Sequence, residues 1–197
     1  MFTGLISHRG QFTGYRKNQT ELLIEVPLPL ADRLATGDSL AVDGVCLTLT
    51  RKEKNCLFFN LSKETLKMTT LSELKPGKRL NLELPLTINS LVGGHLVTGH
   101  VDGCGQVIDI RSTTPGKRLR IRLSRELRKL LVEKGSVAVN GVSLTVASLG
   151  SDYFEVELIP LTLSQTNLND LRPGNKVNLE CDIIGKYVYN FISRRRS

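Results

Sequence analysis

The chain contains one sequence twice, and the second copy follows the first at an interval of 97 residues. Residues 39–48 (SLAVDGVCLT) return as residues 136–145 (SVAVNGVSLT), with seven of the ten positions identical. Residues 65–83 (TLKMTTLSELKPGKRLNLE) return as residues 162–180 (TLSQTNLNDLRPGNKVNLE), with ten of the nineteen identical. A repeat of this length is a whole domain rather than a short solenoid unit. The sequence therefore predicts two related domains with two related pockets, and the positions at which the copies differ become the most informative ones.

Composition argues against a metal site and against a disulfide framework. Hydrophobic residues make up 40% of the chain and charged residues 23%, as in an ordinary globular protein. The cysteines form no CxxC pair, and the three histidines do not bracket them at zinc-finger spacing. Free thiols indicate a reducing cytosol, so we expect a cytoplasmic protein. The cysteines are Cys46, Cys56, Cys104 and Cys181.

Charge and hydropathy argue against two further classes of protein. The first residues lack the basic and apolar regions of a signal peptide, and no run of about 18 apolar residues could span a membrane. The net charge of +8 suggests nucleic-acid binding, but Lys and Arg are spread along the chain and aromatic residues are only 5%. The dense run at residues 194–196 is interpreted as a solvated chain end. We expect no nucleic-acid or membrane partner, although an anionic partner stays open.

Short apolar or alternating runs predict a mostly β protein. Turn signals such as Lys75-Pro76-Gly77 and Arg172-Pro173-Gly174 separate these runs. Many short strands within about a hundred residues favour a small antiparallel barrel in each copy. The predicted strands include residues 21–26, 55–60, 79–84, 118–123 and 153–158.

Helix is expected only in short pieces. Residues 124–131 begin with a capping serine, and residues 29–34 are a shorter counterpart in the first copy. The tail places Tyr187, Val188, Phe191 and Ile192 on one helical face that has no counterpart in the repeat. We interpret this apolar stripe as an oligomer contact.

The boundary between the copies falls between residues 88 and 97, in a segment of small residues that the repeat does not match. We expect the first domain at residues 1–95 and the second at residues 96–186. The C-terminal helix and basic tail are expected at residues 187–197.

The strongest site signal is the glycine-rich run of residues 93–103, GGHLVTGHVDG. Glycines let the backbone approach a ligand closely. In a strand, His95 and His100 would face opposite sides, so they would not hold one metal together. At an interval of 95 residues His100 aligns with Leu5, so the fold does not need the imidazole. The pattern favours a functional His100 and leaves His95 evenly balanced between a site residue and a connecting turn.

A second signal is the exchange of Cys46 for Ser143 between the copies. A lone cysteine among apolar residues is usually a buried small hydrophobe. Because the repeat places a hydroxyl there, the position tolerates polarity, which favours a pocket wall. Thr48 and Thr145 alternate onto the same face of their strands. These positions could supply hydrogen bonds to a planar heterocycle.

A third signal is a threonine that persists while its neighbours change, because Lys63-Glu64-Thr65 becomes Pro160-Leu161-Thr162. Capping of a strand end is the simpler explanation. A retained threonine among altered neighbours favours one ligand contact kept in two unequal sites. The Asn-Leu-Glu segments at residues 81–83 and 178–180 persist symmetrically, so we interpret them as structural.

Together these blocks resemble the riboflavin synthase family. The opening Met-Phe-Thr-Gly stands at residues 1–4, and the two Gly-Val-(Cys/Ser)-Leu-Thr motifs stand at residues 44–48 and 141–145. The Gly-Gly-His-x-x-x-Gly-His-Val-Asp-Gly motif stands at residues 93–103, and Glu-Thr-Leu at residues 64–66. The match covers nearly the whole chain, and this set of motifs in this order is highly specific.

The resemblance implies an all-β fold of two homologous antiparallel Greek-key β-barrels in tandem, followed by a short C-terminal helix that forms a homotrimer. It implies the dismutation of two 6,7-dimethyl-8-ribityllumazine molecules to riboflavin and 5-amino-6-ribitylaminouracil. In this transferase reaction a four-carbon unit moves between the two lumazines, with no metal and no other cofactor. Each barrel would bind one lumazine, where the first barrel of one subunit meets the second barrel of a neighbour. Association with lumazine synthase stays open.

The resemblance also implies site residues, position by position. Catalytic roles are expected for His100, Cys46, Ser39 and Asp182. The first-barrel site would use Gly4, Leu5, Ile6, Ser39, Cys46, Leu47, Thr48, Asn60, Leu61, Ser62, Lys63, Glu64, Thr65, Gly99, His100 and Val101. The second-barrel site would use Lys134, Ser143, Leu144, Thr145, Ile159, Pro160, Leu161, Thr162, Leu163, Ser164 and Asp182.

Two departures and one alternative accompany the resemblance. Leu161 and Leu91 stand where the family often has polar residues, which bears on the polar contacts of the second site. The alternative function is that of the lumazine protein of luminescent bacteria, which shares the fold and binds lumazine without turnover. That protein typically lacks the intact Gly-Gly-His-x-x-x-Gly-His segment, whereas this chain keeps it, so a catalyst is favoured.

Overall fold

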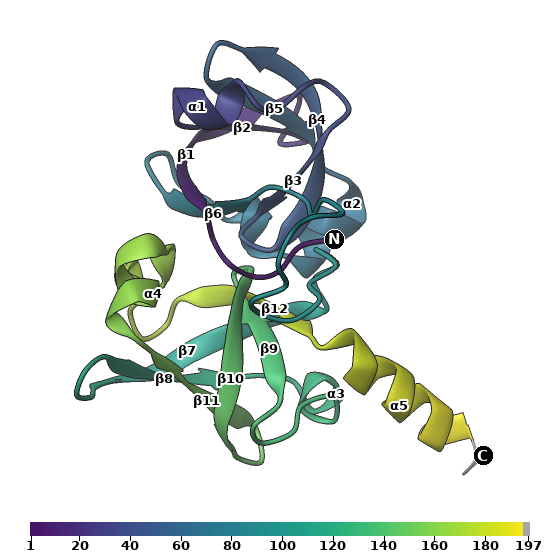
Figure 1. Ribbon diagram of the computed structural model, residues 1–197, viewed down its shortest axis with the longest axis vertical. Coiled ribbons are helices and arrows are strands. Elements are labelled where there is room, and N and C mark those ends of the chain that lie inside the picture. The colour runs from purple at the N-terminus through teal and green to yellow at the C-terminus, as the bar shows by residue number, and fades with distance from the viewer. Residues whose placement is uncertain (195–197) are drawn as a thin grey trace.

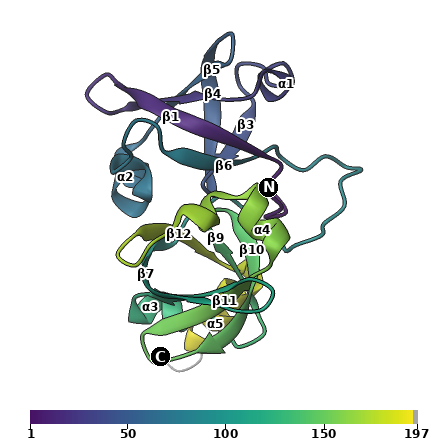
Figure 2. The same ribbon diagram turned by 90° about the vertical axis from the view of Figure 1, so that its left-hand side faces the viewer.

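Two closed antiparallel barrels of six strands each follow one another along the chain. The structure is a computed structural model, and it describes residues 1–194. Figure 1 shows the first barrel above the second, and Figure 2 shows the same stack from the side. The predicted all-β fold of two similar barrels in tandem is thereby confirmed.

The first barrel consists of β1 (His8–Arg16), β2 (Glu21–Glu25), β3 (Ser39–Val42), β4 (Val45–Glu53), β5 (Cys56–Asn60) and β6 (Arg79–Glu83). The strand order is β1-β2-β5-β4-β3-β6, and pairing of β1 with β6 closes the barrel. Strands β3, β4 and β5 are joined in sequence while β2 lies beside β5, which is a Greek-key arrangement.

The second barrel repeats this topology. It consists of β7 (Gly103–Ser112), β8 (Lys117–Arg122), β9 (Ser136–Val139), β10 (Val142–Leu149), β11 (Tyr153–Leu158) and β12 (Lys176–Cys181). Strand β12 pairs with both β7 and β9, as β6 pairs with β1 and β3. The strands therefore occupy equivalent places in the two copies, as the sequence repeat requires.

Each barrel encloses its own apolar core. Buried positions alternate with wetter ones along strands such as β4 and β10, because successive side chains of a strand point to opposite faces. Leucine, valine and isoleucine dominate both cores, and Phe12, Phe59 and Phe154 add large buried rings. Two separate cores are what two independent domains of this size can build.

Short helices lie in the connections between strands of the barrels. Helix α3 (Arg125–Arg128) begins where the sequence predicts, because the Leu127 backbone N–H donates to Ser124 Oγ at 3.3 Å, but it ends earlier than expected. Helices α2 (Lys63–Met68) and α4 (Pro160–Gln165) are missing from the sequence prediction, since six residues are too few to show a helical period. Helix α1 (Leu28–Ala31) and the 3₁₀ turns Thr70–Ser72 and Asn167–Asp170 complete the set within residues 1–194.

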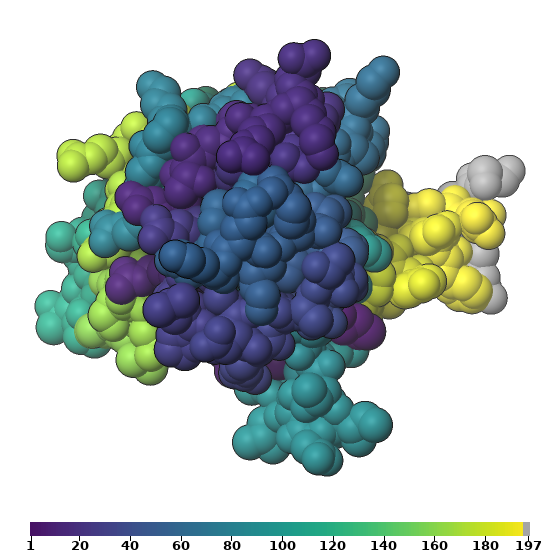
Figure 3. All heavy atoms as spheres, turned by 90° about the horizontal axis from the view of Figure 1, so that it is seen from above, coloured from purple at the N-terminus to yellow at the C-terminus, as the bar shows by residue number. Residues whose placement is uncertain are grey.

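The C-terminal helix α5 (Ile183–Arg194) is attached at its first turn, where Lys186 Nζ lies 2.6 Å from Asp102 Oδ1, and the rest of it projects away from the barrels, as does the linker that joins them (Figure 3). The helix begins before the expected residue 187 because the Ile184 backbone N–H donates to the Asp182 carboxylate at 3.0 Å, which caps the first turn. Within residues 1–194, no helix has the length and apolar character needed to cross a membrane. Residues 195–197, which include part of the expected basic tail, lie outside the described residues.

Candidate functional site

The segment that precedes each barrel packs against the other barrel. The Ser143 backbone N–H of the second barrel donates to the Gly4 carbonyl oxygen at 2.9 Å. In the same way, the Cys46 backbone N–H of the first barrel donates to the Gly99 carbonyl oxygen at 2.9 Å. The expectation that Gly4, Leu5 and Ile6 belong to the first-barrel site is therefore wrong, because this segment lies at the second barrel.

We call the two segments that precede the barrels, which contain residues 3–6 and 98–101, the crossing segments. Two buried glutamates hold them in place. Both carboxylates accept three hydrogen bonds, Glu83 from the backbone N–H and hydroxyl of Thr3 and from the Gly4 N–H, at 2.7 to 3.0 Å. Glu180 accepts the equivalent three from Thr98 and Gly99 at 2.6 to 2.9 Å. Burial raises the pKa of Glu83, and the three donors oppose that rise. The symmetric persistence of these glutamates is thus explained by a structural role.

Glycine is required where the crossing segments meet the strands. Gly4 and Gly99 have φ angles of +75° and +82°, which other residues rarely adopt. A Cβ atom on Gly99 would lie 2.5 Å from Cys46 Cβ, and one on Gly4 would lie 2.5 Å from Ser143 Cβ. The backbone of each crossing segment is therefore pressed against the residue that differs between the copies.

A pocket of about 280 Å³ opens at the first barrel beside Cys46. Helix α2 forms one wall, where Ser62 Oγ accepts from the Thr65 backbone N–H at 3.0 Å and lies 2.9 Å from Thr65 Oγ1. The crossing segment forms the opposite wall. The lining residues are Val45, Cys46, Ser62, Glu64, Thr65, Met68, Thr69, Gly99, His100 and Val101.

This lining brings together seven of the residues expected at the first-barrel site and adds three that sequence reasoning missed. Val45, Met68 and Thr69 are the additions, and the only available signal for them was their closeness to Cys46 and Thr65 in sequence. Leu47 and Leu61 are buried in the barrel core, so they do not offer side chains to a ligand there. Ser39 lies across from Thr48 in the β3–β4 ladder, outside the lining, and Asn60 and Lys63 are exposed nearby.

At the second barrel, the hydroxyl of Ser143 contacts a histidine that the sequence left undecided. Ser143 Oγ lies 2.7 Å from His95 Nδ1. Among the described residues, His95 Nε2 is buried without a hydrogen-bond partner. Burial lowers the pKa of His95, while the negative charges of Asp182 and Glu180 act in the opposite direction. Burial therefore favours the neutral imidazole, whose Nδ1 can accept a hydrogen bond from the Ser143 hydroxyl.

Gly94 makes this contact possible. A Cβ atom there would lie 2.2 Å from the Thr3 carbonyl oxygen and 2.8 Å from Ser143 Cβ. The adjacent glycine in the sequence was the available signal for His95, because it marks a backbone that must pass close to another segment.

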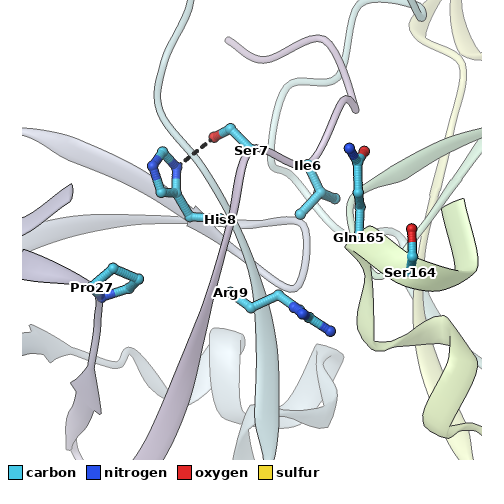
Figure 4. Close-up of a pocket in the computed structure, with 7 residues that line it drawn as sticks. All are labelled: Ile6, Ser7, His8, Arg9, Pro27, Ser164 and Gln165. Atoms are coloured by element: carbon cyan, nitrogen blue, oxygen red, sulfur yellow. Dashed lines mark hydrogen bonds between the residues drawn. The ribbon is translucent and has the colours of Figure 1, made fainter. Parts of the chain in front are cut away.

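Helix α4 carries most of the other residues expected at the second site. Leu144 is buried in the core, whereas Thr145 and Lys134 are exposed. Ser164 helps to line a cavity of about 530 Å³ between the crossing segment and α4, in which Ile6 lies beside Gln165 (Figure 4). Its lining residues are Ile6, Ser7, His8, Arg9, Pro27, Ser164 and Gln165.

The two sites differ in the polarity of their rims. At the first barrel, Ser62, Glu64 and His100 are polar and exposed. Their repeat counterparts at the second barrel are Ile159, Leu161 and Leu5, which are apolar and between 52% and 58% exposed. No group of three or more His, Cys, Asp and Glu side chains within residues 1–194 is arranged to hold a metal ion. The chain thus offers two related sites with unequal chemistry.

Comparison with known proteins agrees with this duplicated architecture. The family model described as lumazine binding domain matches twice, at residues 3–85 and 98–182. A riboflavin synthase from Actinobacillus pleuropneumoniae is 38% identical over 99% of this chain and 91% of its own length. The riboflavin synthase of Mycobacterium tuberculosis is 41% identical over 95% of this chain and 96% of its own length.

A similar fold occurs in LumP, whose structure in complex with 6,7-dimethyl-8-(1'-D-ribityl) lumazine superposes with a TM-score of 0.83. That superposition covers 92% of this chain and 99% of LumP at 24% sequence identity, so it speaks for the fold alone.

Proposed function

This chain belongs to the riboflavin synthase family, and we propose that it converts two molecules of 6,7-dimethyl-8-ribityllumazine into riboflavin and 5-amino-6-ribitylaminouracil. It is a transferase, because a four-carbon unit passes from one lumazine to the other. The observation that carries this proposal is the pair of related but unequal sites on one chain. Two identical substrate molecules with different roles in one reaction need such a pair.

The reaction requires each of the two lumazine molecules to be activated in a different way. One lumazine must lose a proton from its acidic 7-methyl group, and the other must accept a nucleophile at C7. Two pterins held face to face in the right orientation supply much of the acceleration. Acid and base groups then contribute about 10²–10⁴-fold.

We assign the proton transfer to the first-barrel pocket. His100 lies in its wall next to Cys46. An imidazole can both accept and return a proton, which the 7-methyl chemistry requires. Glu64 and Ser62 stand on the same rim and can accept hydrogen bonds from ribityl hydroxyl groups.

We assign the nucleophilic addition to the second-barrel site. As Ser143 Oγ bonds to C7, the hydroxyl proton passes to His95 Nδ1, which lies 2.7 Å from Oγ. If a water molecule oriented by Ser143 adds instead, the water gives its proton to Ser143 Oγ while the hydroxyl proton of Ser143 passes to His95. The π bond between C7 and its ring nitrogen breaks, and its electron pair moves onto the nitrogen and into the pterin ring, so no group has to leave. Asp182 supports the protonated imidazole through its negative charge. The other family positions, including Ser39, Lys134 and the residues of α4, remain proposed substrate contacts.

The geometry favours a reaction between two chains. Helix α2, which walls the first-barrel pocket, and helix α4 at the second-barrel site lie on opposite flanks of the molecule (Figure 1). Two lumazines bound at these places in one chain could not stack on each other. We therefore propose that the first barrel of one chain meets the second barrel of another.

Helix α5 should hold the proposed homotrimer together. Tyr187, Val188 and Ile192 are 71%, 52% and 48% exposed, and exposed apolar stripes usually mark contacts. We expect a chain that ends at Lys186 to sediment as a monomer with folded barrels. Ser193→Ala, on the same helix, should leave the trimer intact. An unchanged trimer after the truncation would remove α5 from the interface.

Gly99→Ala should weaken lumazine binding at the first-barrel pocket by about tenfold or more. The added Cβ would meet Cys46 Cβ, and the positive φ angle adds strain of roughly 1–3 kcal/mol. Gly14→Ala is a suitable control, because a Cβ there meets nothing within 4 Å. Titration of lumazine fluorescence on both variants measures the difference, and equal affinities would show that the pocket wall is not where we place it.

A turnover assay tests the proposed activity against the alternative of a lumazine carrier. The purified protein should convert 6,7-dimethyl-8-ribityllumazine into a product with the absorption spectrum of riboflavin. A carrier would change the fluorescence of lumazine without forming riboflavin. Ser143→Ala, which removes the proposed nucleophile, should bind lumazine but slow the conversion.

The cellular setting remains part of the proposal. All four cysteines are free, which suits the reducing cytoplasm. Association with lumazine synthase, which would supply the substrate directly, is a further expectation of the family resemblance.

A further inference from the structure

The two barrels meet along a buried polar seam made of Asp43, Asn81, Asn140, Asn167 and Asn178, none more than 3% exposed. Asn178 Nδ2 donates to the Asp43 carbonyl oxygen at 2.8 Å. The equivalent bond runs the other way, from Asn81 Nδ2 to the Asn140 carbonyl oxygen at 3.0 Å. The seam therefore repeats itself about a local two-fold axis.

The centre of the seam is a backbone contact between two glycines. A Cβ atom on Gly44 would lie 2.6 Å from the Gly141 nitrogen, and one on Gly141 would lie 2.7 Å from the Gly44 nitrogen. Both barrels thus present nearly the same surface to each other. A surface of this kind is self-complementary, so a first barrel could also meet the first barrel of a second copy.

Two residues of the seam differ from their counterparts in the other copy, and these two residues contact each other. Asp43 has Asn140 as its repeat counterpart, and Asn167 has Thr70. Asn167 Nδ2 donates to Asp43 Oδ1 at 2.8 Å. At the counterpart place, Thr70 provides only its backbone N–H, which donates to Asn178 Oδ1 at 2.8 Å.

We propose that the hydrogen bond between Asn167 and Asp43 selects the partner of the first barrel. It makes the first barrel pair with a second barrel and disfavours pairing with the first barrel of a second copy. In that wrong pairing, Asp43 would face Thr70 of the other copy, which has no side-chain amide to donate. The contact at Gly44 would also place the two Asp43 residues, each next to its Gly44, on either side of one backbone contact. A buried Asp43 that loses the Asn167 amide and keeps only the Asn81 backbone N–H as a donor is costly, so the wrong pairing is disfavoured.

The test makes the seam symmetric in the full-length chain. Asp43→Asn copies Asn140, and Asn167→Thr copies Thr70, so both residues suit sites that the fold already contains. The wild type, the double variant and the control Lys67→Ser are unfolded and refolded at low and high protein concentration. Lys67→Ser also makes the copies more alike, at an exposed position outside the seam. The mass of each refolded species is then measured by light scattering after size exclusion.

The wild type and the control should refold to one mass at every concentration. The double variant should gain heavier species at high concentration, in a fraction at least about tenfold above the wild type, because a hydrogen bond to a charged group discriminates on that scale. A double variant that refolds to the wild-type mass at all concentrations would overturn the proposal. If the double variant does not fold, Asp43→Asn alone is judged by the same two outcomes.

Discussion

Replacing His100 by alanine should slow riboflavin formation by about 10²–10⁴-fold, the usual contribution of a positioned acid or base. His100 lies in the wall of the first-barrel pocket, and its repeat counterpart is Leu5, so the barrel itself does not need the imidazole. Single-turnover kinetics across a range of pH, together with lumazine affinity, separates a lost proton transfer from lost binding. Affinity should change little while the rate falls and its pH profile changes.

Cys46→Ser is the matched comparison for His100→Ala. The repeat already places Ser143 at the equivalent point of the second barrel, with its backbone N–H bonded to the crossing segment in the same way. We therefore expect Cys46→Ser to keep substantial activity. If His100→Ala kept the wild-type rate and pH profile while Cys46→Ser was inactive, the nucleophile would be Cys46 and the proton-transfer assignment would be wrong.

Asp43→Asn should stabilise the folded chain by about 2–4 kcal/mol at pH 8 and by much less at pH 4. Burial raises the pKa of Asp43 from 3.8 to about 7, although the Asn81 backbone N–H, Lys78 and Asn167 act in the opposite direction. The folded state therefore binds a proton that the unfolded state has already released between about pH 4 and pH 7. The wild type should lose stability as pH rises through this window and stay level above it.

Urea unfolding at a series of pH values measures this effect. The free energy of unfolding of Asp43→Asn should not decline between about pH 4 and pH 7. The control Asp32→Asn, which changes an exposed residue, should show the same decline as the wild type. Parallel pH profiles for the wild type and Asp43→Asn would show that Asp43 does not hold its proton in the fold. A variant that is more stable but pairs its barrels less faithfully would agree with the role proposed for the seam, since polar groups can specify a partner at a cost in stability.

The sequence was sufficient for the two barrels because the repeat and the alternating runs act locally. Strands such as β8 and β11 follow from alternation alone. The pocket around Cys46 and Thr65 was also predictable, because the two copies keep the scaffold there and change the neighbours. These signals depend only on residues close together in the chain or on the fixed interval between the copies.

The crossing segments could not be predicted in the same way. The interval of 95 residues shows that residues 3–4 correspond to residues 98–99, but it does not show which barrel each segment contacts. That choice depends on long-range bonds such as those of Glu83 and Glu180. The role of His95 depends on the same choice of barrel. Ser143 contacts the imidazole because the backbone of Gly94 packs against Thr3 and Ser143 of the second-barrel site.

A mixing experiment tests most directly the central claim that two unequal half-sites from different chains act together. His100→Ala impairs the first-barrel half and Ser143→Ala impairs the second, so each variant alone should form riboflavin slowly. The two variants carry different tags, are produced together, and are purified through both tags in succession. The mixed assembly contains sites in which an intact first barrel meets an intact second barrel, so we predict that riboflavin formation reappears well above either variant alone. A mixed assembly no faster than the average of the two variants would contradict the account.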